Sequence, residues 1–408
     1  LACLYILRRK VNLFPDSGIG KVLVVLFLVG PVLTVFSNTE PIMFGVGGLP
    51  GLRLHDSFAA LSSQLLYTLP FFLGRQFLAT ESAQRELLRA LLIGGMIYSV
   101  PMLYEVRMSP VLNTQIYGFF QHNFDQMIRQ GGFRPIVFLY HGIWVAFFGL
   151  MAVIAAFALR RAEPPEMRMR YLMMAVYLTV VMFLCKTLNV QIYFLLFIPL
   201  ILFFSQSMQI RVAAVLACMA FTYPLLRGWD LVPVEWLLET AAKISEHRAG
   251  SLYFRLYNEG ILLEHANTQP FFGWGSWGRN LLYNEQTGEA ITVPDGRWII
   301  TMGVYGYVGY IVEFGLLSLP LIMLALNLKK AQAAQLSPYI GPLCMILGIN
   351  MVDMLPNATL ISMTWLIAGA LLGYAERVVA GLPTRSDVSS EEEPIASNPE
   401  PLRPRTVM

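Results

Sequence analysis

Two arginines in this sequence stand where a guanidinium group could bind a phosphate through two parallel hydrogen bonds. Arg134 directly precedes Pro135, a residue that suits the first turn of a helix. Arg255 stands four residues before Glu259 in a stretch that is predicted to be helical. Each arginine also has an ordinary explanation. Arg134 could reach lipid head groups at a membrane surface, and Arg255 could form a surface ion pair with Glu259.

Asp295 is placed to act as a general base. It lies near the end of a loop of about 70 residues, 227–297, just before an apolar segment. A carboxylate there could take a proton from a hydroxyl group, or it could cap the helix that begins nearby.

Glycines follow two patterns in the same region. The stretch 270–278 could form an anion-binding nest or a tight turn packed by Trp274. Gly303, Gly306 and Gly309 lie on one face of the next predicted helix, which would allow close packing against a neighbouring helix.

Ionisable residues also occur inside apolar segments, where they indicate function by default. His141 lies about two turns into a predicted helix, 135–158. A neutral histidine bonded to a neighbouring helix is the alternative. Glu313 and Asp353 are expected to hold the helices together or to line a cavity between them.

Composition places these residues in a membrane protein. Only 13% of the 408 residues are charged and 56% are hydrophobic, whereas soluble domains average about 25% charged residues. The mean hydropathy is +0.57, and the net charge of only +3 argues against nucleic-acid binding. The four cysteines show neither a disulfide pattern nor a zinc motif.

Ten apolar segments approach the length of about 20 residues that a membrane-spanning helix needs. They are 20–37, 57–79, 88–104, 135–158, 170–185, 189–206, 211–227, 303–326, 338–355 and 358–375. Residues 1–7 look like the end of a further apolar helix that is truncated here. The sequence therefore predicts an all-α, polytopic integral membrane protein with about ten full transmembrane helices and one truncated helix at the N-terminus.

Basic residues fix the expected orientation of these helices. Compact clusters such as Arg8–Lys10, Arg160–Arg161 and Lys329–Lys330 occupy every second connection, as cytoplasmic loops do. The large loop then falls on the outer side, which is the periplasm in a Gram-negative cell, and the protein lies in the inner membrane.

The predicted organisation has four parts. Two short helices are expected within the loop, over 234–247 and 252–265. The C-terminal tail is rich in Ser, Glu and Pro, which predicts a disordered cytoplasmic segment. The parts are a helical block (1–226), the periplasmic loop (227–302), a three-helix block (303–376) and the tail (377–408).

The order of these features resembles the bacterial O-antigen ligase and O-antigen polymerase family. A large outer loop precedes three helices, and Arg255, the stretch Pro270–Gly275 and the pair Gly306 and Gly309 follow one another as in that family. The resemblance extends over about 115–322 and elsewhere rests on hydropathy alone. It implies about twelve helices and an enzyme that transfers glycan from undecaprenyl pyrophosphate to a hydroxyl group outside the cytoplasmic membrane, without a metal or other cofactor.

The resemblance also implies roles for single residues. Loop and interface arginines of the family hold the pyrophosphate, which corresponds here to Arg255 and Arg134. Ligases carry a catalytic histidine at a fixed spacing before the two glycines, and that spacing gives Asp295 in this chain. The departure favours a polymerase-like or divergent enzyme of exopolysaccharide or capsule synthesis over lipid A-core ligation. The further substrate-binding candidates are Arg279, Arg297, His141, Trp274 and Asp353.

The expected partners are an undecaprenyl-pyrophosphate-linked oligosaccharide, an acceptor glycan, membrane lipids and polysaccharide-export proteins, with no nucleic acid. Two other classes stay open. Polar residues within helices, such as His141 and Glu313, would also suit a transporter or flippase of lipid-linked saccharides, although no internal repeat is visible. A non-catalytic subunit of a polysaccharide assembly complex is the third class.

Overall fold

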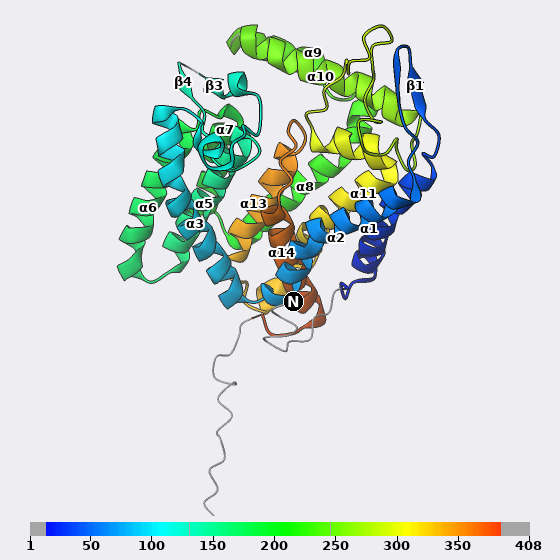
Figure 1. Cartoon of the computed structure of the whole chain (residues 1–408). Coiled ribbons are helices and arrows are strands. Elements are labelled where there is room, and N and C mark those ends of the chain that lie inside the picture. Colours follow the sequence, from blue (N-terminus) through cyan, green and yellow to red (C-terminus); the bar gives the residue numbers. More distant parts are fainter. Residues whose placement is uncertain (1–13, 130, 245, 385–408) are drawn as a thin grey trace, which may run out of the picture.

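A bundle of long helices carries small elements at one end, which we call the loop end (Figure 1). The computed structural model describes residues 14–129, 131–244 and 246–384. The predicted helix remnant at 1–7, the cluster Arg8–Lys10 and the tail beyond 384 lie outside the described residues. The elements at the loop end are β1 (Ile42–Phe44), β2 (Gly47–Leu49), α4 (Leu112–Tyr117), η2 (Phe124–Met127), β3 (Ile128–Arg129), β4 (Gly132–Phe133), α9 (Val234–Ile244) and α10 (Glu246–Asn267).

All ten predicted segments fall on helices. They are α1 (Gly18–Phe36), α2 (Leu54–Phe77), α3 (Glu81–Met108), α5 (Gly142–Ala162), α6 (Pro165–Leu184), α7 (Leu188–Phe203), α8 (Gln206–Gly228), α11 (Arg297–Leu326), α13 (Ile340–Asp353) and α14 (Ser362–Ala380). Among the described residues, seven of these helices are long and apolar enough to cross a membrane, whereas α7 and α13 are apolar but shorter. The all-α class is confirmed apart from two small antiparallel hairpins, β1–β2 and β3–β4, and the two helices expected in the large loop correspond to α9 and α10.

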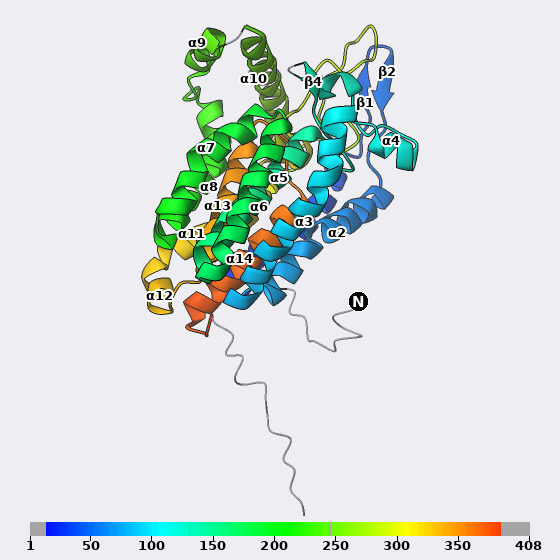
Figure 2. The same cartoon turned by 90° about the vertical axis from the view of Figure 1, so that its left-hand side faces the viewer.

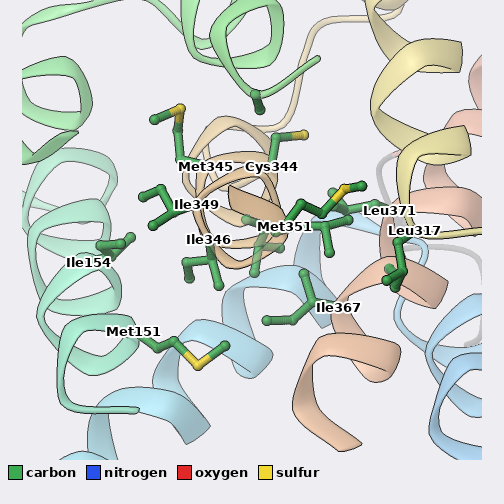
Figure 3. Close-up of a cluster of buried hydrophobic side chains, with 14 of the residues drawn as sticks. Met151, Ile154, Leu317, Cys344, Met345, Ile346, Ile349, Met351, Ile367 and Leu371 are labelled. Carbon is green, nitrogen blue, oxygen red and sulfur yellow. The ribbon is translucent and has the colours of Figure 1, made fainter. Parts of the chain in front are cut away.

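The core is centred on α13, which packs on α8 and lies between α5, α11 and α14. Figure 3 shows Ile349 of α13 pointing toward Ile154 of α5, with Leu317 of α11 and Leu371 of α14 on the opposite side of the same helix. Almost every residue of α13 is buried. An apolar helix that is covered all round belongs inside a bundle, so its 14 residues give a core helix rather than a lipid-facing one.

Helix α11 is interrupted at Gly306. This glycine has φ 67° and ψ −169°, a backbone conformation that is almost confined to glycine. The expectation of a continuous helix with Gly303, Gly306 and Gly309 on one face is therefore wrong. Thr301 donates to Glu313 over 2.9 Å, although twelve residues of straight helix would separate them by about 18 Å. The break must therefore turn the second half of α11 sharply against the first.

The glycine-rich stretch 270–275 occupies this break. Backbone groups that an interrupted helix leaves unpaired inside an apolar bundle need other partners, and here the stretch supplies them from both sides. The four hydrogen bonds run from Trp274 N–H to Gly303 O (2.8 Å), Gly275 N–H to Val304 O (3.0 Å), Tyr307 N–H to Pro270 O (2.7 Å) and Val308 N–H to Phe271 O (3.3 Å). The two glycine patterns of the sequence are thus one structural unit, and these backbone groups are not free to form an anion nest.

Candidate functional site

Arg255 and Asp295, which are forty residues apart in the sequence, are in contact at the loop end. Arg255 Nε on α10 lies 3.2 Å from Asp295 Oδ2, two residues before α11, and each side chain is 36% exposed. Both line a pocket with an empty volume of about 230 Å³ that opens to solvent, with Glu259, Ile299 and Leu355 among its other lining residues. Asp295 does not cap the helix. The N-cap residue of α11 is Gly296, and no side chain forms a capping hydrogen bond there.

Glu259 does not pair with Arg255. Its carboxylate accepts a hydrogen bond from the Tyr223 hydroxyl over 2.7 Å and lies 3.3 Å from Arg227 Nε. Burial raises the pKa of Glu259. The predicted Arg255–Glu259 pair is therefore replaced by two separate ion pairs, and a second carboxyl group faces the same pocket as Asp295.

Arg134 belongs to a cluster of positive charge beside this pocket. Its side chain is buried, and Nε has no hydrogen-bond partner among the described residues. Burial, together with the positive charges of Arg129 and Arg255, lowers the pKa of Arg134 to about 10. Within the described part of the chain, neither Arg129 nor Arg134 forms a salt bridge. We call Arg129, Arg134 and Arg255 the arginine cluster. Among the described residues, its positive charge is balanced by an acidic side chain only at Arg255, through Asp295.

The segment that follows Arg134 is not helical, so the predicted start of the helix at Pro135 is wrong. Helix α5 begins at Gly142, and His141 is its N-cap residue rather than a residue two turns inside it. Val137 has φ 50°, which a right-handed helix does not contain. The buried Glu105 carboxylate of α3 accepts the N–H groups of Ile136 (2.8 Å) and Val137 (2.7 Å) of this non-helical segment.

His141 faces the arginine cluster as a neutral donor. Its Nδ1 accepts the N–H of Ile143 over 3.0 Å, so the proton of the neutral ring must be on Nε2. Burial, together with the nearby His122, Arg134 and Arg255, lowers the pKa of His141 to about 3. The imidazole can therefore donate to an anion near neutral pH without carrying a charge of its own.

Lys186 is a neighbour of the arginine cluster that the sequence analysis missed. It lies between α6 and α7 with a left-handed backbone, φ 53°, and its ammonium group donates to the carbonyl of Arg129 over 3.2 Å. Gly132 makes this approach possible, because a Cβ there would overlap the Lys186 Nζ. The sequence did contain an indication of this role. Lys186 is a basic residue in a connection on the predicted outer side of the membrane, where the compact basic clusters are otherwise absent from the sequence.

Arg279 and Arg297 already have partners within the fold. Arg279 is buried and donates to three backbone carbonyl groups, and burial lowers its pKa. Arg297 pairs with the buried Glu313, with Nε–Oε1 and Nη2–Oε2 distances of 2.8 and 2.5 Å. Neither residue lines the pocket of Arg255 and Asp295. The bonds of Arg279 tie the loop to residues 40 and 50 beside the β1–β2 hairpin, and the Arg297–Glu313 pair joins the two halves of α11 across the break.

Trp274 and Asp353 also lie outside that pocket. Trp274 stacks on His265 with ring centroids 4.6 Å apart and donates to the His265 carbonyl. Asp353 is fully buried and accepts hydrogen bonds from four side chains. The donors are Asn189 (2.7 Å), Tyr193 (3.1 Å), Asn357 (3.0 Å) and Thr359 (2.8 Å). The contacts of Trp274 and Asp353 suit a structural role, and substrate binding by these two residues stays a prediction.

A helical bundle with apolar, membrane-length helices and ionised groups gathered at one end defines a protein of the multi-pass membrane class. In the described ranges, no three His, Cys, Asp or Glu side chains are grouped as a metal site requires. No protein-family model matches the chain and no curated protein is similar to it. The resemblance to O-antigen ligases and polymerases therefore rests on the residues themselves and remains a prediction.

Proposed function

We propose that this protein transfers glycan from an undecaprenyl-pyrophosphate carrier to a hydroxyl group of an acceptor glycan, as a polymerase or ligase of surface polysaccharide. The contact between Arg255 and Asp295 carries the proposal. It joins the residue expected to bind the leaving group and the residue expected to remove the proton. It lies beside Arg134, which has no acidic partner among the described residues.

The donor side of the reaction uses the arginine cluster. A diphosphate accumulates negative charge as it leaves, and guanidinium groups stabilise that charge through bidentate hydrogen bonds. Arg134 and Arg129 have no acidic partner in the described part of the chain, so a bound diphosphate would not have to displace one. The neutral His141 would add an uncharged donor.

The acceptor side uses Asp295. The acceptor oxygen attacks the anomeric carbon of the donor sugar, and the bond from that carbon to the phosphate oxygen breaks. The bonding electron pair leaves with undecaprenyl pyrophosphate, and the acceptor proton passes to the Asp295 carboxylate. No metal is required, since the arginines neutralise the leaving group and the carboxylate takes the proton.

The proposed orientation puts the loop end in the periplasm of a Gram-negative cell and the opposite end in the cytoplasm. Figure 2 shows α12 (Leu328–Ala333), which carries Lys329 and Lys330, at the end remote from α9 and α10. Arg85 and Arg161 flank connections that also lie away from the loop end. Basic residues favour the cytoplasmic side. In a Cys218→Ser background, a cysteine at Asp230 should react with an impermeant maleimide in cells whose outer membrane is permeabilised.

The decisive test is a reconstituted assay with a purified lipid-linked oligosaccharide. Wild-type protein should release undecaprenyl pyrophosphate and lengthen or transfer the glycan, and Asp295→Asn should lower the rate by about 10²–10⁴. Asp230→Asn is the matched control, because Asp230 is a largely exposed loop carboxylate outside the pocket. Absence of released carrier with wild-type protein, under conditions where the donor binds, would refute the proposal.

One observation favours a transporter of lipid-linked saccharides as the second candidate. Transporters commonly place broken helices and buried charges around a binding site, and α11 is broken at Gly306 beside the Arg297–Glu313 pair. A transporter would move the donor across vesicle membranes with its glycan and pyrophosphate intact. The same assay therefore separates the two functions.

A further inference from the structure

The backbone between Arg134 and α5 adopts a conformation that its own sequence does not explain. Val137 has φ 50°, in the left-handed region that a β-branched residue rarely enters. Such conformations persist when the surrounding structure determines them, and they gather at functional sites. Here the strained residue is three positions from Arg134.

Glu105, at the end of α3, is the group that imposes this conformation. Its carboxylate is fully buried and is surrounded by backbone donors rather than by a cation. One oxygen accepts from Ile136 and Val137, and the other accepts from Leu112 over 3.0 Å. Three N–H groups satisfy a charge that burial would otherwise penalise strongly.

Arg134 is thereby held from both sides. Its own N–H donates to the Met127 carbonyl over 2.7 Å, and Glu105 fixes the two residues that follow Pro135. The Arg134 side chain also packs on Gly142, where a Cβ would overlap its aliphatic chain. The direction of the guanidinium group is therefore set by contacts on the backbone before and after it.

We infer that Glu105 is a positioning residue for anion binding: it clamps the backbone at 136–137 so that Arg134 stays in the arginine cluster. The inference rests on the proposed function in one respect, namely that Arg134 binds the diphosphate. Glu105 itself is buried under this backbone and does not touch the substrate.

Glu105→Gln is the informative variant. A glutamine side chain has nearly the same size, but its amide group offers hydrogen atoms to backbone groups that are themselves donors. At least one of the three bonds must therefore be lost. Glu376→Gln is the control for a general loss of stability. Glu376 is also buried and accepts two backbone N–H groups, from Asp16 (2.8 Å) and Ser17 (3.2 Å), and it pairs in addition with Arg75 over 2.7 Å, far from the loop end.

Two measurements on the detergent-purified full chain test the role. The first is the affinity for inorganic pyrophosphate, and the second is hydrogen exchange of peptides that cover 134–141. We expect Glu105→Gln to weaken pyrophosphate binding by about tenfold or more, the weight of one hydrogen bond to a charged group, and to speed exchange at 134–141. Glu376→Gln should lower stability but leave pyrophosphate affinity unchanged.

The outcomes separate the two claims. Wild-type affinity in Glu105→Gln overturns the positioning role, with or without faster exchange, and leaves the proposed function intact. Equal loss of affinity in both variants also overturns it, because a general loss of stability then explains the effect. If wild-type protein binds no pyrophosphate, the anion site of the proposed function is refuted, and the role of Glu105 in anion binding falls with it.

Discussion

Replacing Gly306 by alanine should be among the most damaging single-methyl changes in this fold. The φ of 67° and ψ of −169° at this position lie in a region that only glycine enters easily. A methyl group there would also meet the carbonyl oxygen of Pro270 at 2.6 Å and the carbonyl group of Phe271 still closer. The stretch 270–275 would have to withdraw from the break in α11.

The magnitude follows from two contributions. A residue held in a disfavoured backbone region costs about 1–3 kcal/mol. Withdrawal of the stretch weakens the bonds from Tyr307 to Pro270 and from Val308 to Phe271, each worth about 0.5–1.5 kcal/mol. The free energy of unfolding should therefore fall by about 2–6 kcal/mol. At about 2 °C per kcal/mol, Tm should fall by about 4–12 °C in a thermal unfolding assay in detergent.

Gly315→Ala is the control on the same helix. A Cβ at Gly315 would meet only the Leu23 methyl groups at 3.4 Å, an ordinary contact, and alanine is the better helix former. Gly273→Ala should resemble Gly306→Ala, since its Cβ would lie 2.6 Å from the Gly306 nitrogen. The double variant should lose less than the sum, because both changes break one unit. A Tm for Gly306→Ala equal to that of Gly315→Ala would show that the interrupted helix is not the stable conformation.

Three further predictions concern the site and its surroundings. Arg255→Gln should lower the rate of undecaprenyl pyrophosphate release by about 10²–10³. Its Tm should hardly change, because a partly exposed ion pair contributes at most about 1 kcal/mol. A large fall in Tm would assign Arg255 a structural role. Asp353→Asn should behave in the opposite way and lower stability by about 1–3 kcal/mol, because it leaves one of the four donors around this buried carboxylate unsatisfied. Unchanged stability would contradict this. The pKa of His141 lies near 3 in the folded protein, below about 6.5 in the unfolded chain, so its contribution to stability is present above pH 6.5 and is lost as pH falls toward 3. His141→Asn, which keeps a cap acceptor, should flatten the pH dependence of Tm in that range, and an identical pH profile would exclude the effect.

The positions of the helices could be predicted from the sequence because each depends on a run of apolar residues that is local. The segment 20–37 became α1 and 358–375 became α14 with small shifts at their ends. Helices α9 and α10 were also expected. The resemblance implied that Arg255 and Asp295 serve one reaction, but it did not show that they touch. Their contact depends on how α10 lies against α11.

The errors share a cause, which is a partner distant in the sequence. Gly306 breaks α11 because the stretch 270–275 offers it four backbone bonds. The segment after Pro135 is not helical because Val137 has φ 50°, and Glu105, thirty residues before Pro135 in the sequence, accepts its N–H groups. In each case the local pattern favoured a helix, and groups from elsewhere in the chain bind the backbone of the non-helical segment. Such bonds matter inside the bundle, where an unpaired backbone group is costly.

The arginines at the loop end fall into two groups, and the difference bears on function more than their number does. Arg279 and Arg297 spend their donors on carbonyl oxygens and on Glu313, so each positive charge or donor is compensated within the fold. Arg134 is equally buried but keeps Nε without a partner in the described part of the chain, and it lies near Arg129, another arginine without an acidic partner. A fold gains nothing in stability from a buried guanidinium left in that state. An anion that binds there supplies the missing hydrogen bonds and the opposite charge. Its binding therefore offsets the cost of burying the guanidinium group and stabilises the folded protein. The sequence could not show this difference: the resemblance assigned Arg255 and Arg134 to the pyrophosphate, and Arg279 and Arg297 were candidates by position only. An anion that binds beside Arg134 should accordingly raise Tm in wild-type protein and lose that effect in Arg134→Gln.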